Sequence, residues 1–200
     1  MTRVPAAEDV VAFHDACHGA SDWPANAPPK HAEGVWQVIE LNHRYNCSLW
    51  NEEDLARRRQ VPADEIAANK RAIDGYNQKR NDAIERIDET LLENLSSAVR
   101  RAGARLSSET AGSMIDRLSI LSLKIHHMQL QTMRGDVDQA HIDTCTARAV
   151  RFLDQRRDLA GCLDRLTTET ARGEAWFKIY RQFKMYNDPK LNPAIYGEKR

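Results

Sequence analysis

Residues 114–128, M-I-D-R-L-S-I-L-S-L-K-I-H-H-M, decide the fold of this chain. With a turn of about 100° per residue, the apolar side chains of this stretch lie on opposing sides of a helix. One side holds Met114, Leu118, Leu121, Ile125 and Met128, and the other holds Ile120, Leu123 and, just beyond, Leu130. A helix that is apolar on opposing sides is surrounded by other helices. The sequence therefore predicts an all-α antiparallel helical bundle with a buried central fourth helix at about residues 109–134.

The other periodic stretches are also helical, and no run alternates apolar and polar residues as a β-strand does. Helices are predicted at about residues 6–17, 33–59, 62–102, 109–134, 136–173 and 174–186. Asp136 and Gln139 resemble a capping box for the fifth helix. We expect one helical domain over residues 1–200: a short helix and proline-rich loop in 1–32, the bundle with its long third helix in 33–186, and an irregular tail in 187–200.

Composition excludes several classes of function. The 200 residues carry 29 basic and 29 acidic side chains, so no overall field favours nucleic acid. The apolar runs are far shorter than the ~20 residues that cross a bilayer, and the N-terminus does not resemble a secretory signal. The four cysteines show no C-x-x-C spacing, which is typical of ordinary reduced thiols. We expect a cytoplasmic protein without nucleic-acid partners or a membrane span, and no pattern indicates an oligomeric state.

A row of polar residues lies where the core face of the third helix should be. From residue 74 the chain reads D-G-Y-N-Q-K-R-N-D-A-I-E-R-I-D, and Asn77 falls in the middle of the apolar stripe. Near the stripe centre or at its edge lie Lys70, Asp74, Asn81, Glu85 and Asp88. An unpaired buried polar group costs roughly 1–3 kcal/mol. These side chains are therefore either paired with one another or line a wet pocket.

The second helix repeats this pattern. A heptad seam along it holds His43, Asn46, Trp50, Glu53 and Arg57. A short connection at Pro62 makes the second and third helices antiparallel neighbours, so we expect the seam to meet Asp74, Asn77 and Asn81. Two interpretations remain open: a buried salt-bridge network that fixes helix register, and a functional pocket.

Polar side chains also interrupt the central helix. Asp116 and His127 share the side of Ile120, and Arg117 and Lys124 share another. Long basic side chains can extend out of a bundle into water, so Arg117 and Lys124 are either surface groups or ligands for an anion.

Four segments of the chain, in order, carry a family resemblance. They are residues 41–57 (L-N-H-R-Y-N-C-S-L-W-N-E-E-D-L-A-R), 70–88, 108–128 and 184–193 (K-M-Y-N-D-P-K-L-N-P). Together they resemble a bacterial family known as domain of unknown function 4254, although Ala111 stands where that family often has proline. The resemblance implies a helical protein whose genes often lie among those for lipopolysaccharide or other surface-glycan synthesis. It implies no established activity.

The first functional hypothesis is a small-molecule site, enzymatic or not, for a phosphate-bearing ligand such as a sugar nucleotide. Arg57, Lys70, Arg117 and Lys124 would hold phosphate, and Asn77 and Asn81 would orient hydroxyl groups. The candidate catalytic residues are His43, Glu53 and Asp74. The predicted ligand-binding set is completed by Asn46, Asp116 and His127.

A variant of this hypothesis uses Mg²⁺. All-helical nucleoside-triphosphate pyrophosphatases hold magnesium with E-x-x-E and E-x-x-D pairs on adjacent helices. Here residues 85–88 supply E-x-x-D and residues 52–54 supply further acids, but no E-x-x-E is present. The resulting metal candidates are Glu53, Glu85 and Asp88.

The second hypothesis is a non-catalytic adaptor or subunit of a glycan-assembly complex. Its main feature is the predicted helix at residues 174–186, where aromatic and basic side chains alternate. The set consists of Trp176, Phe177, Lys178, Tyr180, Arg181, Phe183, Lys184 and Tyr186. Such a helix either docks on a partner or packs its aromatic side chains on its own bundle.

Overall fold

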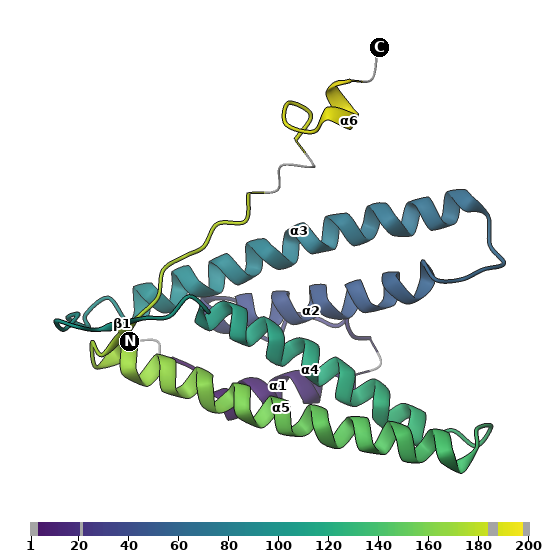
Figure 1. The fold of residues 1–200 in the computed structure, drawn as a ribbon, viewed down its shortest axis with the longest axis horizontal. Helices are drawn as coiled ribbons and strands as arrows, with labels where there is room; N and C mark the ends of the chain where they lie inside the picture. The colour runs from purple at the N-terminus through teal and green to yellow at the C-terminus, as the bar shows by residue number, and fades with distance from the viewer. Residues whose placement is uncertain (1–3, 21, 184–187, 198–200) are drawn as a thin grey trace.

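The computed structural model of the chain describes residues 4–20, 22–183 and 188–197 (Figure 1). Its helices are α1 (Ala7–Cys17), α2 (Gly34–Leu55), α3 (Ala63–Asn94), α4 (Ala111–Thr132), α5 (Gln139–Ala171) and the short α6 (Pro193–Tyr196). Two-residue strands, β1 (Arg105–Leu106) and β2 (Ala175–Trp176), pair in parallel. The predicted all-α class is confirmed. None of the described helices is both long and apolar enough to cross a bilayer.

The central position predicted for the fourth helix is also confirmed. α4 packs against α1, α2, α3 and α5, and in Figure 1 it runs between the α2–α3 pair and α5. Ile115 and Leu118 on α4 are almost completely buried in the core. Around them lie Ile39 of α2, Ile87 of α3 and Leu163 of α5. Burial of a side chain of this size stabilises the fold by about 1.5–3 kcal/mol.

Close backbone contact fixes α4 against α3. Thr110 caps α4 by accepting a hydrogen bond from the Ser113 amide at 3.1 Å, and the Ser113 hydroxyl accepts one from the Thr110 amide at 2.9 Å. Asp88 of α3 accepts a hydrogen bond from the Gly112 amide at 2.6 Å. A Cβ atom at position 112 would lie 2.5 Å from the carbonyl oxygen of Ile84, so only glycine permits this approach.

The predicted end of the third helix and the predicted helix at residues 174–186 are wrong for a shared reason. α3 ends at Asn94 instead of near residue 102, and residues 174–183 form β2 and non-helical chain instead of a helix. The two segments pair with each other: the Arg101 amide donates to the Gly173 carbonyl at 2.9 Å, and the Ser107 amide donates to the Trp176 carbonyl at 2.8 Å. These long-range bonds satisfy backbone groups that helices would have satisfied locally. Lys184 and Tyr186 lie outside the described residues.

The N-cap residue of the fifth helix lies two residues later than predicted. The Asp138 side chain, and not that of Asp136, accepts a hydrogen bond from the backbone of the first turn, the His141 amide at 2.8 Å. Asp136 instead forms an ion pair with Arg134 at 2.6 Å. Asp138 therefore has the geometry of an N-cap residue, whose side chain accepts from the amide three residues ahead.

Candidate functional site

A layer of buried polar side chains joins α2 to α4. Asn42 and Asn46 of α2 each donate an amide hydrogen bond to Asp116 Oδ1 of α4, both at 2.9 Å. His43 Nδ1 lies 2.8 Å from the Ser119 hydroxyl, which also accepts a hydrogen bond from Asn46 at 3.0 Å. The spacing of these residues along α2 and α4 places them on facing sides of the two helices. Their mutual hydrogen bonds offset the cost of burying a carboxylate.

The partners of the α2 seam therefore differ from the prediction. His43 and Asn46 were expected to meet the polar row of α3, but their hydrogen bonds go to Asp116 and Ser119 on α4. The reason is geometric: in the bundle α2 touches both α3 and α4, and the first half of the seam faces α4. The later seam residues face α3 across a cavity.

A cavity of about 400 Å³ opens between α2, α3 and α4, beside the polar layer. We call it the α2–α3 cavity. Its lining consists of Asn46, Leu49, Trp50, Glu53, Asp54, Arg57, Asn77, Arg80, Ile120 and Leu123. Leu49 and Leu123 are buried, whereas Asp54 and Arg57 are exposed. The cavity therefore combines an apolar interior with a charged mouth.

Arg80 of α3 is the most unusual residue of this lining. Its Nε atom lies 3.9 Å from Asp116 Oδ1, too far for a hydrogen bond, and that oxygen already accepts from two amides. Nε is buried and has no hydrogen-bond partner among the residues described. A guanidinium cannot lose its proton in a protein, so this N–H needs an acceptor. Arg80 itself lines the α2–α3 cavity, so a ligand bound there is the candidate source of such an acceptor.

Several of the predicted ligand-binding residues, and the catalytic candidate Glu53, meet here. Asn46, Glu53, Arg57 and Asn77 line the cavity, and Asp116 adjoins it through Asn46 and Arg80. His127 lies next to it, because its ring stacks on Trp50 with centroids 4.4 Å apart. Burial and the neighbouring His126 lower the pKa of His127, which keeps its ring neutral near pH 7.

Other predicted residues lie elsewhere. Arg117 and Lys124 line a second cavity of about 570 Å³ between α4 and α5, which we call the α4–α5 cavity. Arg117 is paired there with Glu109, and Lys124 lies over the Phe152 ring, 5.6 Å from its centroid. Lys70 and Asp74 form an exposed ion pair on α3 at 2.6 Å. Asn81 is half-buried on α3 and is not part of either lining.

The three carboxylates predicted for Mg²⁺ have separate partners. Glu53 pairs with Arg57 at 2.7 Å, and Glu85 pairs with Arg181 at 2.7 Å. Asp88 accepts a hydrogen bond from the Gly112 amide at the start of α4. Burial at this position raises the pKa of the Asp88 carboxyl to about 6. Among the described side chains, these acids do not form a group that could hold a metal ion.

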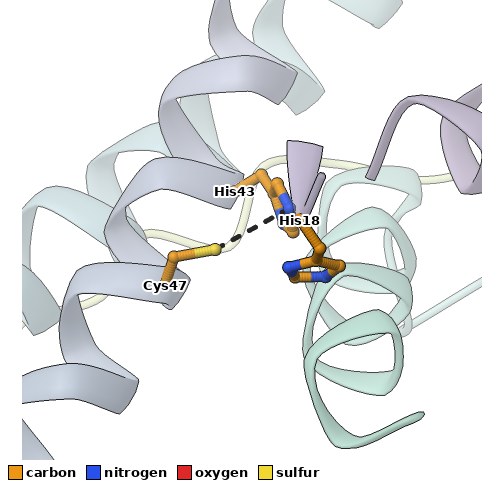
Figure 2. Close-up of side chains that lie close together, drawn as sticks. All are labelled: His18, His43 and Cys47. Carbon is orange, nitrogen blue, oxygen red and sulfur yellow. Dashed lines mark hydrogen bonds between the residues drawn. The ribbon is translucent and has the colours of Figure 1, made fainter. Parts of the chain in front are cut away.

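One group of metal-ligating side chains does converge, and it was not predicted. His18, at the end of α1, lies beside His43 and Cys47 of α2 (Figure 2). Arg80 was also missed, although it lies three residues after Asn77 and so on the same face of α3. His18 had no comparable signal, because it follows a short helix and precedes a proline-rich loop.

The comparisons with known proteins agree with the sequence motifs. A model of the family described as "Protein of unknown function (DUF4254)" matches residues 36–179, which include every residue that lines the α2–α3 cavity. Comparison with curated proteins and with solved structures gave no match. Since the family match covers more than half of the sequence, the chain belongs to the DUF4254 family of proteins of unknown function.

Proposed function

We propose that this protein binds an anionic, phosphate-bearing small molecule in the α2–α3 cavity. The observation that carries the proposal is the buried Arg80 Nε, which faces a carboxylate whose near oxygen is already taken by two amides. A phosphate oxygen is a strong acceptor for an arginine N–H. It would satisfy this donor without disturbing the hydrogen bonds of Asp116.

The rest of the lining suits such a ligand. Small-molecule sites are typically about 300–1,000 Å³ in volume and mostly apolar, with a few polar groups that fix orientation. Trp50 offers a flat surface for a ring, and the Asn77 amide can bind a hydroxyl group. Arg57 is a second cation at the mouth. Its ion pair with Glu53 is exposed, so it is weak and can exchange for phosphate.

The geometry supports binding more than a particular reaction. Both ring nitrogens of His43 face other groups: Nδ1 faces Ser119, and Nε2 lies 3.7 Å from the Cys47 sulfur. His43 is therefore a poor choice for a proton-transfer residue in the cavity. Glu53 and Asp54 are the carboxylates at the mouth, where they can accept hydrogen bonds from sugar hydroxyls.

The ligand class follows from the family resemblance. That resemblance implies genes that lie among those for surface-glycan synthesis, a process that uses nucleotide sugars and sugar phosphates in the bacterial cytoplasm. We therefore propose a nucleotide sugar or a sugar phosphate as the ligand, and a cytoplasmic role in the synthesis of lipopolysaccharide or another bacterial polysaccharide.

A thermal-shift panel tests this proposal. The full chain is melted with UDP-glucose, GDP-mannose, glucose 1-phosphate, UMP and pyrophosphate, each with and without Mg²⁺. At a ligand concentration of about 100 Kd, binding stabilises the fold by about 2.7 kcal/mol, which gives a clear rise in Tm. Arg80→Gln should lose most of that rise. Arg117→Gln, in the α4–α5 cavity, is the matched control and should keep it.

Two results would contradict the proposal. One is a panel in which no compound shifts the melting of the wild-type chain, which would favour a non-catalytic adaptor. The other is a shift that Arg117→Gln abolishes and Arg80→Gln leaves intact, which would place the ligand on the other side of α4.

A further inference from the structure

His18, His43 and Cys47 bring three metal-ligating atoms together where the end of α1 meets α2. One ligand atom from each side chain lies within 4.8 Å of the other two. Figure 2 shows the two imidazole rings beside the Cys47 sulfur. From this arrangement we propose that the three residues bind Zn²⁺. None of the three residues lines the α2–α3 cavity, so this site is independent of the proposed anion site.

The spacing suits a tetrahedral zinc ion. Zn–N bonds of about 2.0–2.1 Å and Zn–S bonds of about 2.3 Å separate tetrahedral nitrogen and sulfur ligands by roughly 3.6 Å. His43 Nε2 lies 3.7 Å from Cys47 Sγ, so this pair is already in position. The His18 ligand atom lies within 4.8 Å of the other two, so a shift of roughly 1.5 Å or less completes the set. Its position at the end of a helix allows such a shift.

Outer hydrogen bonds orient both imidazoles for metal binding. His18 Nε2 lies 3.0 Å from the Ser122 hydroxyl, whose proton goes to Asp15 at 2.7 Å. Ser122 must therefore accept from His18 Nε2–H, which leaves the lone pair on Nδ1. His43 Nδ1 lies 2.8 Å from the Ser119 hydroxyl and its Nε2 faces Cys47, so the tautomer that donates Nδ1–H to Ser119 presents the Nε2 lone pair for metal binding. Zinc-bound histidines almost always donate their second ring N–H in this way.

The protonation states of the two histidines also fit. Burial lowers the pKa of His18 to about 4, and burial together with His14 lowers the pKa of His43 well below its ordinary value. Both rings are therefore neutral near pH 7, as metal ligands must be. Burial raises the pKa of the Cys47 thiol to about 12, so zinc would displace its proton on binding. The Trp23 indole donates to the sulfur at 3.1 Å and would stabilise the thiolate.

A second observation points to the same place. His14 is completely buried and stacks on His43, with ring centroids 4.5 Å apart. Neither of its ring nitrogens has a hydrogen-bond partner in the described part of the chain. A buried imidazole without a partner costs roughly 1–3 kcal/mol. A zinc ion with three protein ligands keeps one position for water, and such a water would bring a hydrogen-bonding group into this layer of histidines.

The donor set favours zinc over magnesium. Two imidazole nitrogens and one thiolate sulfur are borderline and soft ligands, which zinc accepts and which magnesium, a hard cation, does not. Structural zinc sites use four protein ligands, whereas sites with three leave a coordination position for water or a substrate.

The chain contains its own control for this site. On α5, Cys145 Sγ lies 3.5 Å from His141 Nε2, with the same four-residue spacing as Cys47 and His43. Among the described residues, no third metal-ligating side chain joins this pair. If a buried His–Cys pair were sufficient for zinc binding, both positions would bind it. If the third ligand is required, only the first would.

The experiment uses the untagged full chain, stripped of metal and titrated with Zn²⁺ against a chromophoric chelator. We expect one zinc per chain, with binding weakened at least about 100-fold in His18→Gln and Cys47→Ser and unchanged in Cys145→Ser. Co²⁺ in place of zinc should give a thiolate-to-metal charge-transfer band that Cys47→Ser removes. Circular dichroism checks that each variant is folded. If Cys47→Ser does not fold, His18→Gln tests the site alone, because His18 is only half-buried.

Two outcomes would overturn the zinc site. The wild-type chain could fail to compete with the chelator for zinc. Alternatively, folded His18→Gln could bind zinc as tightly as the wild type, which would mean that the bound metal is adventitious. Neither outcome bears on the anion cavity, because none of the three ligands lines it.

Discussion

The two sides of α4 differ in how their charged side chains are paired. Towards α2 and α3, Asp116 is buried under two amides, and Arg80 reaches towards it without completing a hydrogen bond. Towards α5, Arg117 is paired with Glu109, and Lys124 lies over Phe152 at the edge of a larger cavity. Ile120 contributes to both cavities. In the larger cavity one cation is ion-paired and the other lies over an aromatic ring, whereas the smaller cavity has an unsatisfied buried donor. Chemistry therefore identifies the candidate site better than size does.

The largest expected difference between the two sides concerns stability. Asp116→Ala removes the acceptor of two buried amides and the nearest counter-charge of Arg80. Removing one partner of a buried charged network costs about 3–5 kcal/mol. Arg117→Ala breaks an exposed pair and should cost no more than about 1 kcal/mol. Urea unfolding measures both values, and equal losses would remove the distinction between the two sides.

The next prediction concerns pH and the contact that fixes α4 against α3. Burial raises the pKa of Asp88 from 3.8 to about 6 in the folded chain. A raised carboxyl pKa stabilises the fold at pH values below about 4, and this contribution is lost as the pH rises through 6. The wild type should therefore lose about 2–3 kcal/mol relative to Asp88→Asn between pH 4 and pH 7. A pH-independent difference in their free energies of unfolding would refute this assignment.

A smaller effect is expected at Ser119. Its hydroxyl is shared by His43 and Asn46, so Ser119→Ala leaves two buried polar groups with fewer partners. The expected loss is about 1–2 kcal/mol of unfolding free energy. Cys162→Ser, an exposed position in the α4–α5 cavity, should change stability by less than about 0.5 kcal/mol. A Ser119→Ala chain as stable as wild type would show that this hydroxyl does not hold the polar layer together.

The sequence pattern predicted those features of the fold that depend on a single helix or on a short connection between two helices. The opposing apolar sides of residues 114–128 indicated a central helix, and the connection at Pro62 indicated that α2 and α3 are neighbours. The pairing of residues 101–107 with 173–176 could not be predicted, because it depends on backbone groups distant in sequence. The same limit applies to His18, which reaches His43 and Cys47 only when α1 is packed against the bundle.

The candidate site was predicted only in part, and the missing part has a similar explanation. Helical spacing placed Asn46, Glu53, Arg57 and Asn77 on inward faces, and these four line one cavity. Spacing along a single helix does not indicate which neighbour each face meets, so Arg117 was grouped with residues on the opposite side of α4. The spacing of Arg80 from Asn77 placed it on the same face of α3, but an arginine on a helix is usually a solvated surface group, so it was not selected. Its importance depends on the 3.9 Å gap to Asp116.

The central claim is that the smaller cavity, at Arg80, is the ligand site. A crystal structure of the full chain grown with UDP-glucose tests it most directly. We predict the diphosphate within hydrogen-bonding distance of Arg80 Nε, with the uracil or the sugar against Trp50. Diphosphate bound instead to Arg117 and Lys124 in the α4–α5 cavity, or an α2–α3 cavity that contains only water at saturating ligand, would contradict it.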